Sequence, residues 1–228
     1  MIRLDRVSHR FGERLVLDRV DLHLDEPRIG VVGANGSGKS TLARLLNGLV
    51  LPTGGRVLVD GIDTRRDAAA VRRRVGFVFS DPDAQIVMPT VREDVAFSLR
   101  RHNLPRDVVD EQVLAALARF GLADHADHPA HLLSSGQKQL LAFASVLVTA
   151  PLVLVCDEPT TLLDLRNTAE VLSVLDTLPQ QVILVTHDLD SVAGWERVLV
   201  LAMGRVVADG PGEMAVDAYR RLVREGAC

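Results

Sequence analysis

Residues 33–41 constrain this chain more than any other segment. They read Gly-Ala-Asn-Gly-Ser-Gly-Lys-Ser-Thr and fit the pattern G-x-x-x-x-G-K-[ST]. Glycines in such a loop let the backbone curl, so that successive N–H groups point at phosphate oxygens. An apolar run at residues 28–32 leads into the loop, and leucines at helical spacing follow it as far as Leu49. This is the strand–loop–helix context that the motif requires. The segment therefore predicts a cradle for ATP in an α/β fold.

Two side chains of this phosphate loop have specific expected roles. Lys39 is long enough to reach the β and γ phosphates, and the Ser40 hydroxyl is a suitable ligand for Mg²⁺. The helix that begins near Lys39 adds the positive end of its dipole, about half a charge. The alternative, a glycine-rich turn with an exposed lysine, leaves the full motif unexplained. The predicted contacts with ATP are Asn35, Gly36, Ser37, Gly38, Lys39, Ser40 and Thr41.

An acidic pair follows a second apolar run. Residues 152–156 read Leu-Val-Leu-Val-Cys and lead directly into Asp157 and Glu158. Ligands of α/β sheets lie at the carboxyl ends of the strands, so we expect this pair beside the phosphate loop. Asp157 is expected to hold Mg²⁺ through water, and Glu158 to act as general base on the attacking water. The alternative is an acidic turn that caps the next helix.

A histidine and a serine-rich turn complete the set of candidate site residues. His187 follows the apolar run at residues 182–186, which places it at the same sheet edge and predicts a contact with the γ-phosphate. A lone histidine is otherwise more often structural. Residues 133–137 open a long apolar helix, and Ser134 is suited to be its N-cap. Taken alone, this segment would do no more than start a helix.

The composition limits the class of protein. Of the 228 residues, 47% are hydrophobic and 25% are charged, which is typical of a folded domain. The formal net charge of −4 argues against a duplex nucleic-acid partner, and we expect none. The N-terminus is charged and Pro151 interrupts the longest apolar stretch, so we expect no signal peptide and no transmembrane segment. The two cysteines, Cys156 and Cys228, indicate neither a disulfide framework nor a metal site.

The order of the expected elements predicts a single domain over residues 1–228. Alternating apolar and polar residues at 2–7 indicate a half-exposed antiparallel sheet near the N-terminus. The apolar runs before Asp157 and His187 indicate parallel strands that are covered on both faces. Residues 108–120 and 135–149 have helical patterns. We therefore expect an α/β core with a mixed sheet (residues 1–84 and 151–228), an N-terminal antiparallel β subdomain, and a helical subdomain at about residues 85–150.

The chain resembles an ABC-transporter nucleotide-binding subunit over nearly its whole length. The motifs that carry this resemblance are, in order, residues 33–41, Gln85, residues 133–137, residues 156–158, residues 161–164 and His187. The resemblance implies the ABC type of P-loop NTPase fold and hydrolysis of ATP with Mg²⁺. It also implies that two copies bind head to tail, with two ATP molecules at their interface.

The same resemblance assigns roles to individual residues. Phe11 matches the aromatic residue that stacks on adenine. Gln85 matches the glutamine that contacts Mg²⁺ and the transmembrane partner. Asp164 matches the aspartate that couples the two ATP sites. The loop that closes over the γ-phosphate held by the opposite protomer, here named the signature loop, matches Ser134, Ser135, Gly136 and Gln137.

The sequence departs from the family pattern at three places. Phe11 replaces the more usual tyrosine, which should leave stacking intact. Ser135 stands where the signature usually has glycine, and its side chain could hinder the approach of the backbone to phosphate and slow hydrolysis. Leu162 and Leu163 are bulkier than the usual residues before Asp164. Glu158 and His187 are both present, so the site is expected to be competent.

Two segments narrow the resemblance. Residues 81–97 resemble the ATPases of energy-coupling-factor importers for vitamins and metal ions, and residues 157–167 are most similar to the biotin-transport ATPase. This implies a peripheral protein on the cytoplasmic side of the cell membrane. Its implied partners are a transmembrane coupling subunit and a membrane substrate-binding subunit. The chain is also expected to form an ATP-dependent homodimer, or a heterodimer with a second ATPase.

Other functions remain open at this stage. The chain could serve another ABC transporter, such as one for cobalt, nickel or another small solute. A soluble ABC ATPase would normally carry paired cassettes or long coiled-coil insertions, and a small-molecule phosphotransferase would have no use for the signature loop. The arginines at residues 72–74 and 100–101 are expected to be solvated. His125, His128 and His131 lack a further ligand and are expected at the surface without a metal.

Overall fold

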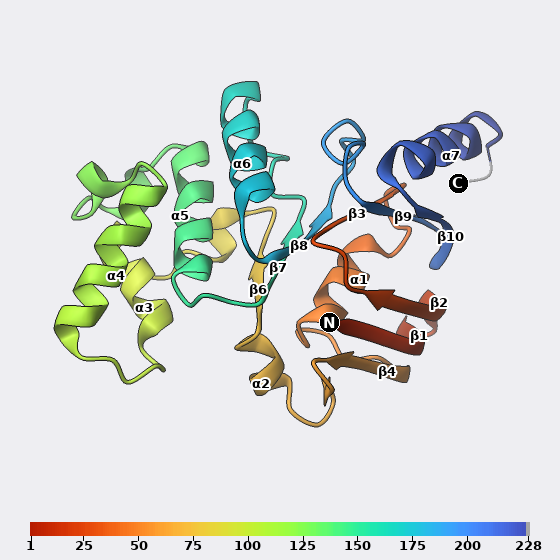
Figure 1. The fold of residues 1–228 in the computed structure, drawn as a ribbon, viewed down its shortest axis with the longest axis horizontal. Coiled ribbons are helices and arrows are strands. Elements are labelled where there is room, and N and C mark those ends of the chain that lie inside the picture. The colour runs from red at the N-terminus through yellow and green to blue at the C-terminus, as the bar shows by residue number, and fades with distance from the viewer. Residues whose placement is uncertain (227–228) are drawn as a thin grey trace. The chain divides into compact units, whose positions relative to one another are not determined.

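A computed structural model describes residues 1–226, so Cys228 lies outside the described residues. The chain divides into two compact units, each of which is described by itself (Figure 1). The first unit comprises Met1–Val75, Leu152–Glu158 and the described residues from Leu178 onward, and the second comprises Gly76–Pro151 and Pro159–Thr177. Within the described residues, no helix is both long enough and apolar enough to cross a membrane.

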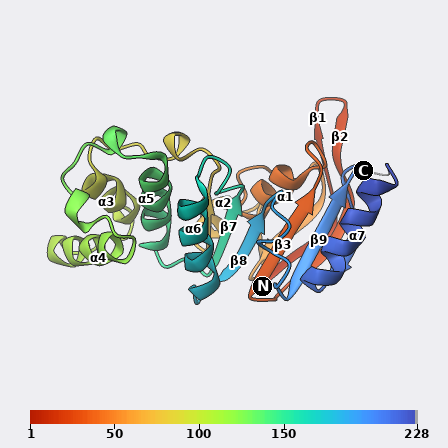
Figure 2. The ribbon, with the colours of Figure 1, turned by 90° about the horizontal axis from the view of Figure 1, so that it is seen from above.

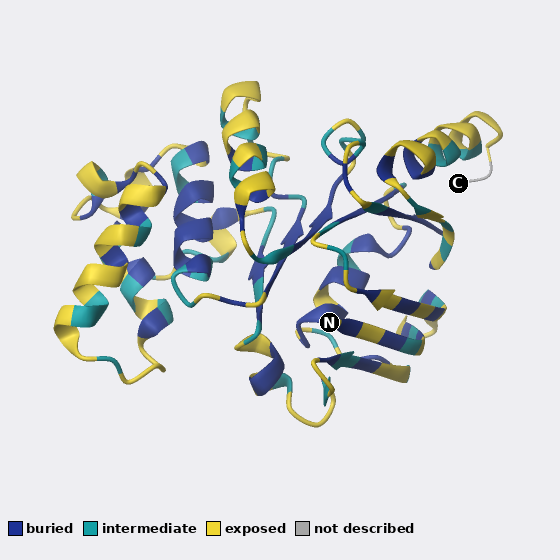
Figure 3. Ribbon diagram, viewed as in Figure 1, coloured by how far each residue is buried: buried dark blue, intermediate teal, exposed yellow. Residues whose placement is uncertain are grey.

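An antiparallel sheet opens the first unit. Its strands follow the order β2-β1-β4-β5, and their alternating buried and exposed residues are visible in Figure 3. This confirms the antiparallel N-terminal sheet that the alternation at residues 2–7 predicts. The first strand extends beyond the predicted range and ends at Phe11. The strands are β1 (Ile2–Phe11), β2 (Arg14–Leu24), β4 (Gly54–Val59) and β5 (Ile62–Asp63).

The second sheet of this unit carries the candidate site. Its strands follow the order β10-β9-β3-β8-β7, with β3 parallel to both β8 and β9, and β7 parallel to β8. Apolar side chains are buried on both faces, as the continuous apolar runs predict. The carboxyl ends of β3, β7 and β8 therefore meet at one edge. The strands are β3 (Arg28–Gly33), β7 (Val153–Asp157), β8 (Gln181–Val185), β9 (Arg197–Ala202) and β10 (Arg205–Gly210).

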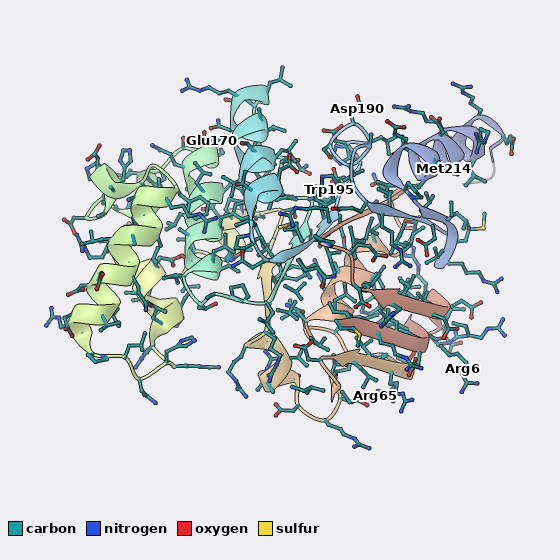
Figure 4. All side chains as sticks on the ribbon, in the orientation of Figure 1. Arg6, Arg65, Glu170, Asp190, Trp195 and Met214 are labelled. Atoms are coloured by element: carbon teal, nitrogen blue, oxygen red, sulfur yellow. The ribbon has the colours of Figure 1, made fainter. Side chains whose placement is uncertain are left out.

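Three α-helices belong to the first unit: α1 (Lys39–Leu46), α2 (Ala68–Arg72) and α7 (Gly212–Arg224). The leucine spacing predicts that α1 continues to Leu49, and this is wrong. Gly48 has a φ of 69°, a left-handed conformation that ends the helix before Leu49. Helix α7 packs along β9, as Figure 2 shows. Figure 4 labels Asp190 and Trp195 in the segment that connects β8 to β9.

The second unit is mainly helical, as the pattern of residues 108–120 and 135–149 predicts. Helix α5 forms its centre, with Leu141 and Phe143 fully buried, and it contacts both α3 and α4. Most of β6 also belongs to this unit. Its elements are β6 (Val75–Val78), η1 (Pro82–Ala84), α3 (Val91–Leu99), α4 (Arg106–Arg119), η2 (Ala123–His125), η3 (Ala130–Leu132), α5 (Ser135–Leu147) and α6 (Leu165–Thr177).

Candidate active site

The phosphate loop joins β3 to α1 and depends on its glycines. Gly33 and Gly38 have φ angles of 148° and 108°, which side-chain-bearing residues rarely adopt. A Cβ atom at Gly33 would lie 2.2 Å from the Leu201 carbonyl oxygen, and one at Gly38 would lie 2.9 Å from that of Val16. Both contacts are too close for any side chain. The loop therefore folds this way because the sequence supplies glycine where β9 and β2 approach it.

Lys39 is held inside this loop. Its side chain is only 6% exposed, and its Nζ donates hydrogen bonds to the carbonyl oxygens of Gly33 (2.8 Å) and Ala34 (3.2 Å). Nζ also lies 3.9 Å from Glu158 Oε1. Burial lowers the pKa of the ammonium group, and the attraction of Glu158 and Asp157 opposes this effect. A negatively charged ligand in the loop would further favour the charged form of Lys39.

Ser37 offers a second group to an anion. Its side chain is buried, and its Oγ has no hydrogen-bond partner within the part of the chain that the structure describes. A buried hydroxyl without a partner is costly, because it loses its bonds to water and gains none in return. A phosphate oxygen in the loop would supply the missing acceptor. The residues present therefore fit ATP at this position.

A pocket of about 320 Å³ opens over the loop. This volume is within the usual range for a small-molecule site. Phe11 lies at its rim, 56% exposed, and its ring contacts the buried His9 ring edge-on, with 4.6 Å between the ring centroids. The pocket is lined by Phe11, Arg14, Val16, Asn35, Gly36, Gly38, Lys39, Ser40, Thr41 and Glu158.

Arg14 is a pocket residue that the sequence reasoning missed. It is paired with Phe11 across the turn between β1 and β2, which has Gly12 in a left-handed conformation. Its Nη2 lies 3.7 Å from the position that a Cβ of Gly36 would occupy. Among the described residues its guanidinium makes no ion pair. The feature of the sequence that could have identified Arg14 is the two-residue turn after Phe11. Such a turn places the residue that follows it directly opposite the aromatic residue.

Ser40 and Asp157 form a pair of oxygen ligands at the start of α1 and the end of β7. The Ser40 hydroxyl donates a hydrogen bond of 2.8 Å to Asp157 Oδ1. Asp157 is only 4% exposed, and burial raises its pKa, while the bond from Ser40 and the charge of Arg44 act in the opposite direction. Mg²⁺ prefers carboxylate and hydroxyl oxygens, so this pair has the donor set that the ion requires.

Glu158 and His187 lie together beyond the ends of β7 and β8. His187 Nδ1 is 2.5 Å from Glu158 Oε2, and His187 is 62% exposed. The backbone of Glu158 has a φ of 54°, which is unfavourable for a residue other than glycine, and its N–H donates to the Val185 carbonyl oxygen. Strained backbone of this kind is concentrated at functional sites. The Glu158 carboxylate lies between Lys39 and His187, with Oε1 facing the first and Oε2 the second.

The first unit thus brings together the phosphate loop, Phe11, Asp157, Glu158 and His187. The remaining site residues that the sequence predicts belong to the second unit. Gln85 lies at the end of η1, where its Oε1 accepts a bond of 3.2 Å from the Phe79 N–H. Asp164 precedes α6, and its Oδ1 accepts a bond of 2.8 Å from the Asn167 N–H.

The signature loop begins helix α5 in this second unit. Ser134 Oγ accepts the Gln137 N–H, and Gln137 Oε1 accepts the Ser134 N–H, which forms a reciprocal capping box. This confirms Ser134 as the N-cap. Ser135 is an exposed first residue of the helix and has no positive φ, so its backbone conformation does not require glycine. A Cβ at Gly136, in contrast, would lie 2.5 Å from Asn167 Cγ.

Comparison with known proteins shows the family of the chain. A family model described as ABC transporter matches residues 17–161. The chain is 56% identical to a putative ABC transporter ATP-binding protein of Deinococcus radiodurans (96% of this chain and 97% of the relative). It is 46% identical to the biotin transport ATP-binding protein BioM of Rhizobium etli (97% and 98%). It is also 42% identical to the energy-coupling factor transporter ATP-binding protein EcfA1 of Bacillus subtilis (99% and 84%).

Solved structures share the fold. The structure of cbiO1 from Clostridium perfringens, part of the ABC transporter complex cbiONQ, superposes with a TM-score of 0.85 at 32% identity and covers 98% of this chain and 93% of its own. The ATP-binding cassette MJ0796, in a dimeric post-hydrolysis state with ADP and Pi, superposes with a TM-score of 0.81 at 28% identity (92% and 98%). Both are similar in fold over almost the whole described chain.

Proposed function

Because this chain belongs to the ABC transporter family as an ATP-hydrolysing subunit, we propose that it powers an importer of the energy-coupling-factor type, with biotin as the proposed cargo. The observation that carries the proposal is the site itself: a glycine-built phosphate loop with Lys39, Asp157, Glu158 and His187 at one sheet edge. The names of two relatives, the BioM protein and the EcfA1 protein, support the type of importer. They support the cargo only by likeness, since the ATPase itself makes no contact with it.

The residues of the first unit divide the work of binding ATP. We propose that Phe11 stacks on adenine, and that Lys39 and the loop N–H groups hold the phosphates together with Asn35 and Ser37. Ser40 and Asp157 would hold Mg²⁺, and Gln85 keeps its proposed role as a further contact of this ion. When bound, Mg²⁺ neutralises charge on the phosphates.

Hydrolysis is assigned to Glu158 and His187. Glu158 accepts a proton from the attacking water at Oε1 or Oε2, and its contact with His187 and the turned backbone orient the carboxylate for this step. His187, 62% exposed, is free to contact the γ-phosphate. Lys39 stabilises negative charge on the phosphates without moving a proton.

A second copy completes the site in this proposal. The signature loop, residues 134–137, would close over the γ-phosphate held by the opposite protomer, and Asp164 would couple the two sites. A relative of the same fold is dimeric with ADP and Pi bound, which supports this arrangement. The partner is either a second copy of this chain or a second ATPase. ATP binding would close the pair, hydrolysis would reopen it, and a membrane subunit docked near residues 85–97 would receive the movement.

An uptake experiment tests the type of importer and its cargo. The chain is affinity-purified from native membranes, the co-purifying membrane subunits are identified, and the same set is reconstituted in vesicles with radiolabelled biotin. We expect a coupling subunit and a small substrate-binding subunit to co-purify, and ATP-dependent biotin uptake that is lost with Lys39→Ala. Co-purification without biotin uptake would contradict the cargo. The absence of any membrane subunit would contradict the importer.

A further inference from the structure

The signature loop is connected to two histidines of the preceding segment. Gln137 Nε2 lies 3.0 Å from His125 Nε2, and His125 Nδ1 lies 2.8 Å from His128 Nδ1. The two imidazole rings are 4.9 Å apart and inclined by 62°. The third histidine of the segment, His131, takes no part in these contacts. The amide of the capping residue Gln137 is therefore one end of a short row of polar groups.

This row of hydrogen bonds has only one possible direction. Gln137 Oε1 accepts from the Ser134 backbone N–H at 3.0 Å, and that group can only donate. The Gln137 amide nitrogen therefore faces His125, and His125 Nε2 must accept. A neutral imidazole has one N–H, so His125 Nδ1 carries the proton and donates it to His128 Nδ1.

A proton on either ring breaks this row. In charged His125, Nε2 is a donor that faces the NH₂ group of the Gln137 amide, which is also a donor. If the amide rotates to offer its oxygen to His125, its NH₂ group then faces the Ser134 N–H, another donor. In charged His128, Nδ1 is a donor that faces His125 Nδ1. His125 could then move its proton to Nε2 only by facing the Gln137 amide with a donor. Every charged form loses at least one hydrogen bond.

We propose that His125 and His128 are positioning residues of the signature loop, which hold the Gln137 amide in place only while both imidazoles are uncharged. This inference rests on the proposed role of the signature loop at the γ-phosphate of the opposite protomer. The capping box fixes one side of the Gln137 amide and His125 fixes the other. The loop thus keeps its shape before any nucleotide or partner arrives, which reduces the free energy needed to order it on closure.

Several charged groups around this segment are bonded to partners other than the two histidines. Arg92 pairs with Asp127 at 3.0 Å, and Lys138 pairs with Asp83 at 2.7 Å. Glu93 accepts bonds from Thr90. The segment carries Asp124, Asp127 and His131. The elements that meet it carry Arg92, Glu93 and Asp94 (α3), Arg106, Asp107, Asp110, Glu111 and Arg119 (α4), and Lys138 (α5). None of these is bonded to His125 or His128 in the described part of the chain.

Nuclear magnetic resonance of the full chain without nucleotide tests the positioning role directly. The side-chain amide signal of Gln137, assigned by its loss in Gln137→Ala, is followed from about pH 8 to 5.5, the range in which histidines change charge. We expect the wild-type signal to move with pH. His125→Ala should show the low-pH position throughout. His128→Gln, which keeps an acceptor for His125 Nδ1, should retain the wild-type position at pH 8.

His131→Asn is the matched control, since it removes a histidine of the same segment that makes no bond to Gln137. Its Gln137 signal should move with pH as in the wild type. A wild-type signal that does not respond to pH would overturn the proposal. So would a His131→Asn variant that loses the response as fully as His125→Ala.

A second readout separates this inference from the function on which it rests. In a Glu158→Gln background, His125→Ala should weaken ATP-driven association about fivefold at pH 8, the effect of one lost hydrogen bond (about 1 kcal/mol), and should flatten its pH dependence. The Gln137 signal could respond to pH while Gln137→Ala, in the Glu158→Gln background, associates as strongly as Glu158→Gln alone. In that case the positioning role stands and the proposed role of the signature loop fails.

Discussion

At the residue scale, the phosphate loop is explained by contacts that admit only glycine, by a buried lysine bonded to the loop's own carbonyl oxygens, and by a buried serine hydroxyl without a partner among the described residues. Gly33 and Gly38 have backbone conformations and neighbours that no side chain tolerates. Lys39 is bound to two carbonyl oxygens, and the Ser37 hydroxyl is buried without a partner among the described residues. The loop is therefore built for an anion before any anion is bound.

Arg14 gives the first prediction at this scale. Its guanidinium has no ion pair in the described chain and lines the same pocket as the phosphate loop, so it should strengthen the binding of phosphates. Arg14→Ala should weaken ATP binding at least about tenfold, as expected for the loss of one hydrogen bond to a charged group (about 1.5–3 kcal/mol). Adenosine binding should not change. Calorimetry with ATP, ADP and adenosine checks this.

Arg14→Lys, which keeps the charge, should restore most of the affinity for ATP. If Arg14→Ala weakened adenosine as much as ATP, Arg14 would act on the shape of the pocket near Phe11 rather than on the phosphates.

Asp157 gives a prediction of pH dependence. Burial raises its pKa in the folded protein, so the ionised carboxylate costs stability. This cost is absent below the unfolded pKa, develops as pH rises towards the folded pKa, and is complete above the folded pKa. Asp157→Asn keeps an oxygen acceptor for Ser40 and removes the charge. The nucleotide-free variant should therefore have a higher Tm than the wild type at pH 7, and the gain should shrink towards pH 4.

Calorimetric melting of both proteins at the two pH values measures this difference. A gain that is equal at pH 7 and pH 4, or a loss at pH 7, would contradict the assigned effect of burial. The same variant should lose Mg²⁺-dependent hydrolysis, because the proposed ligand is removed.

At the element scale, the start of α5 is defined both by its capping box and by its packing on α6. Gly136 is buried against the Asn167 side chain, and Asn167 is itself held by Asp164 through its backbone N–H. The signature loop and the segment of Asp164 are thus in direct contact within the second unit. A change in one should be transmitted to the other.

Gly136→Ala tests this packing. In a helical position with open space around it, replacing glycine by alanine stabilises the folded protein by about 0.5–1 kcal/mol. Here the new Cβ would lie 2.5 Å from Asn167 Cγ, so we expect a net loss of about 1–2 kcal/mol in the free energy of unfolding. Urea denaturation measures it. Asn167→Ala in the same chain should remove most of the loss, and Ser135→Gly should show no comparable loss. Equal losses in the single and double variants would show that Asn167 is not the cause.

The sequence predicts elements whose cause is local and misses features whose cause is tertiary. The strand–loop–helix order around residues 33–41, the antiparallel N-terminal sheet and the N-cap at Ser134 follow from patterns of a few neighbouring residues, and the structure confirms them. The end of α1 depends on the conformation of Gly48. Arg14 and His125 act across turns, on groups that only the folded chain brings close.

At the scale of the whole molecule, family membership and site chemistry agree on an ATPase, while the assembly remains a proposal. The first unit holds the phosphate loop, the acidic pair and His187, and the second holds the signature loop, Gln85 and Asp164. If hydrolysis needs the signature loop of a second copy, the active species is a pair. Its activity should then rise with protein concentration.

The most direct test of the central claim is light scattering of Glu158→Gln with ATP. The variant should bind ATP, hydrolyse it at least about a hundredfold more slowly than the wild type, and have about twice the chain mass of 24.8 kDa. With ADP it should have the mass of a single chain. A Glu158→Gln protein that stays monomeric with ATP and hydrolyses it at the wild-type rate would contradict both the assignment of Glu158 and the shared site.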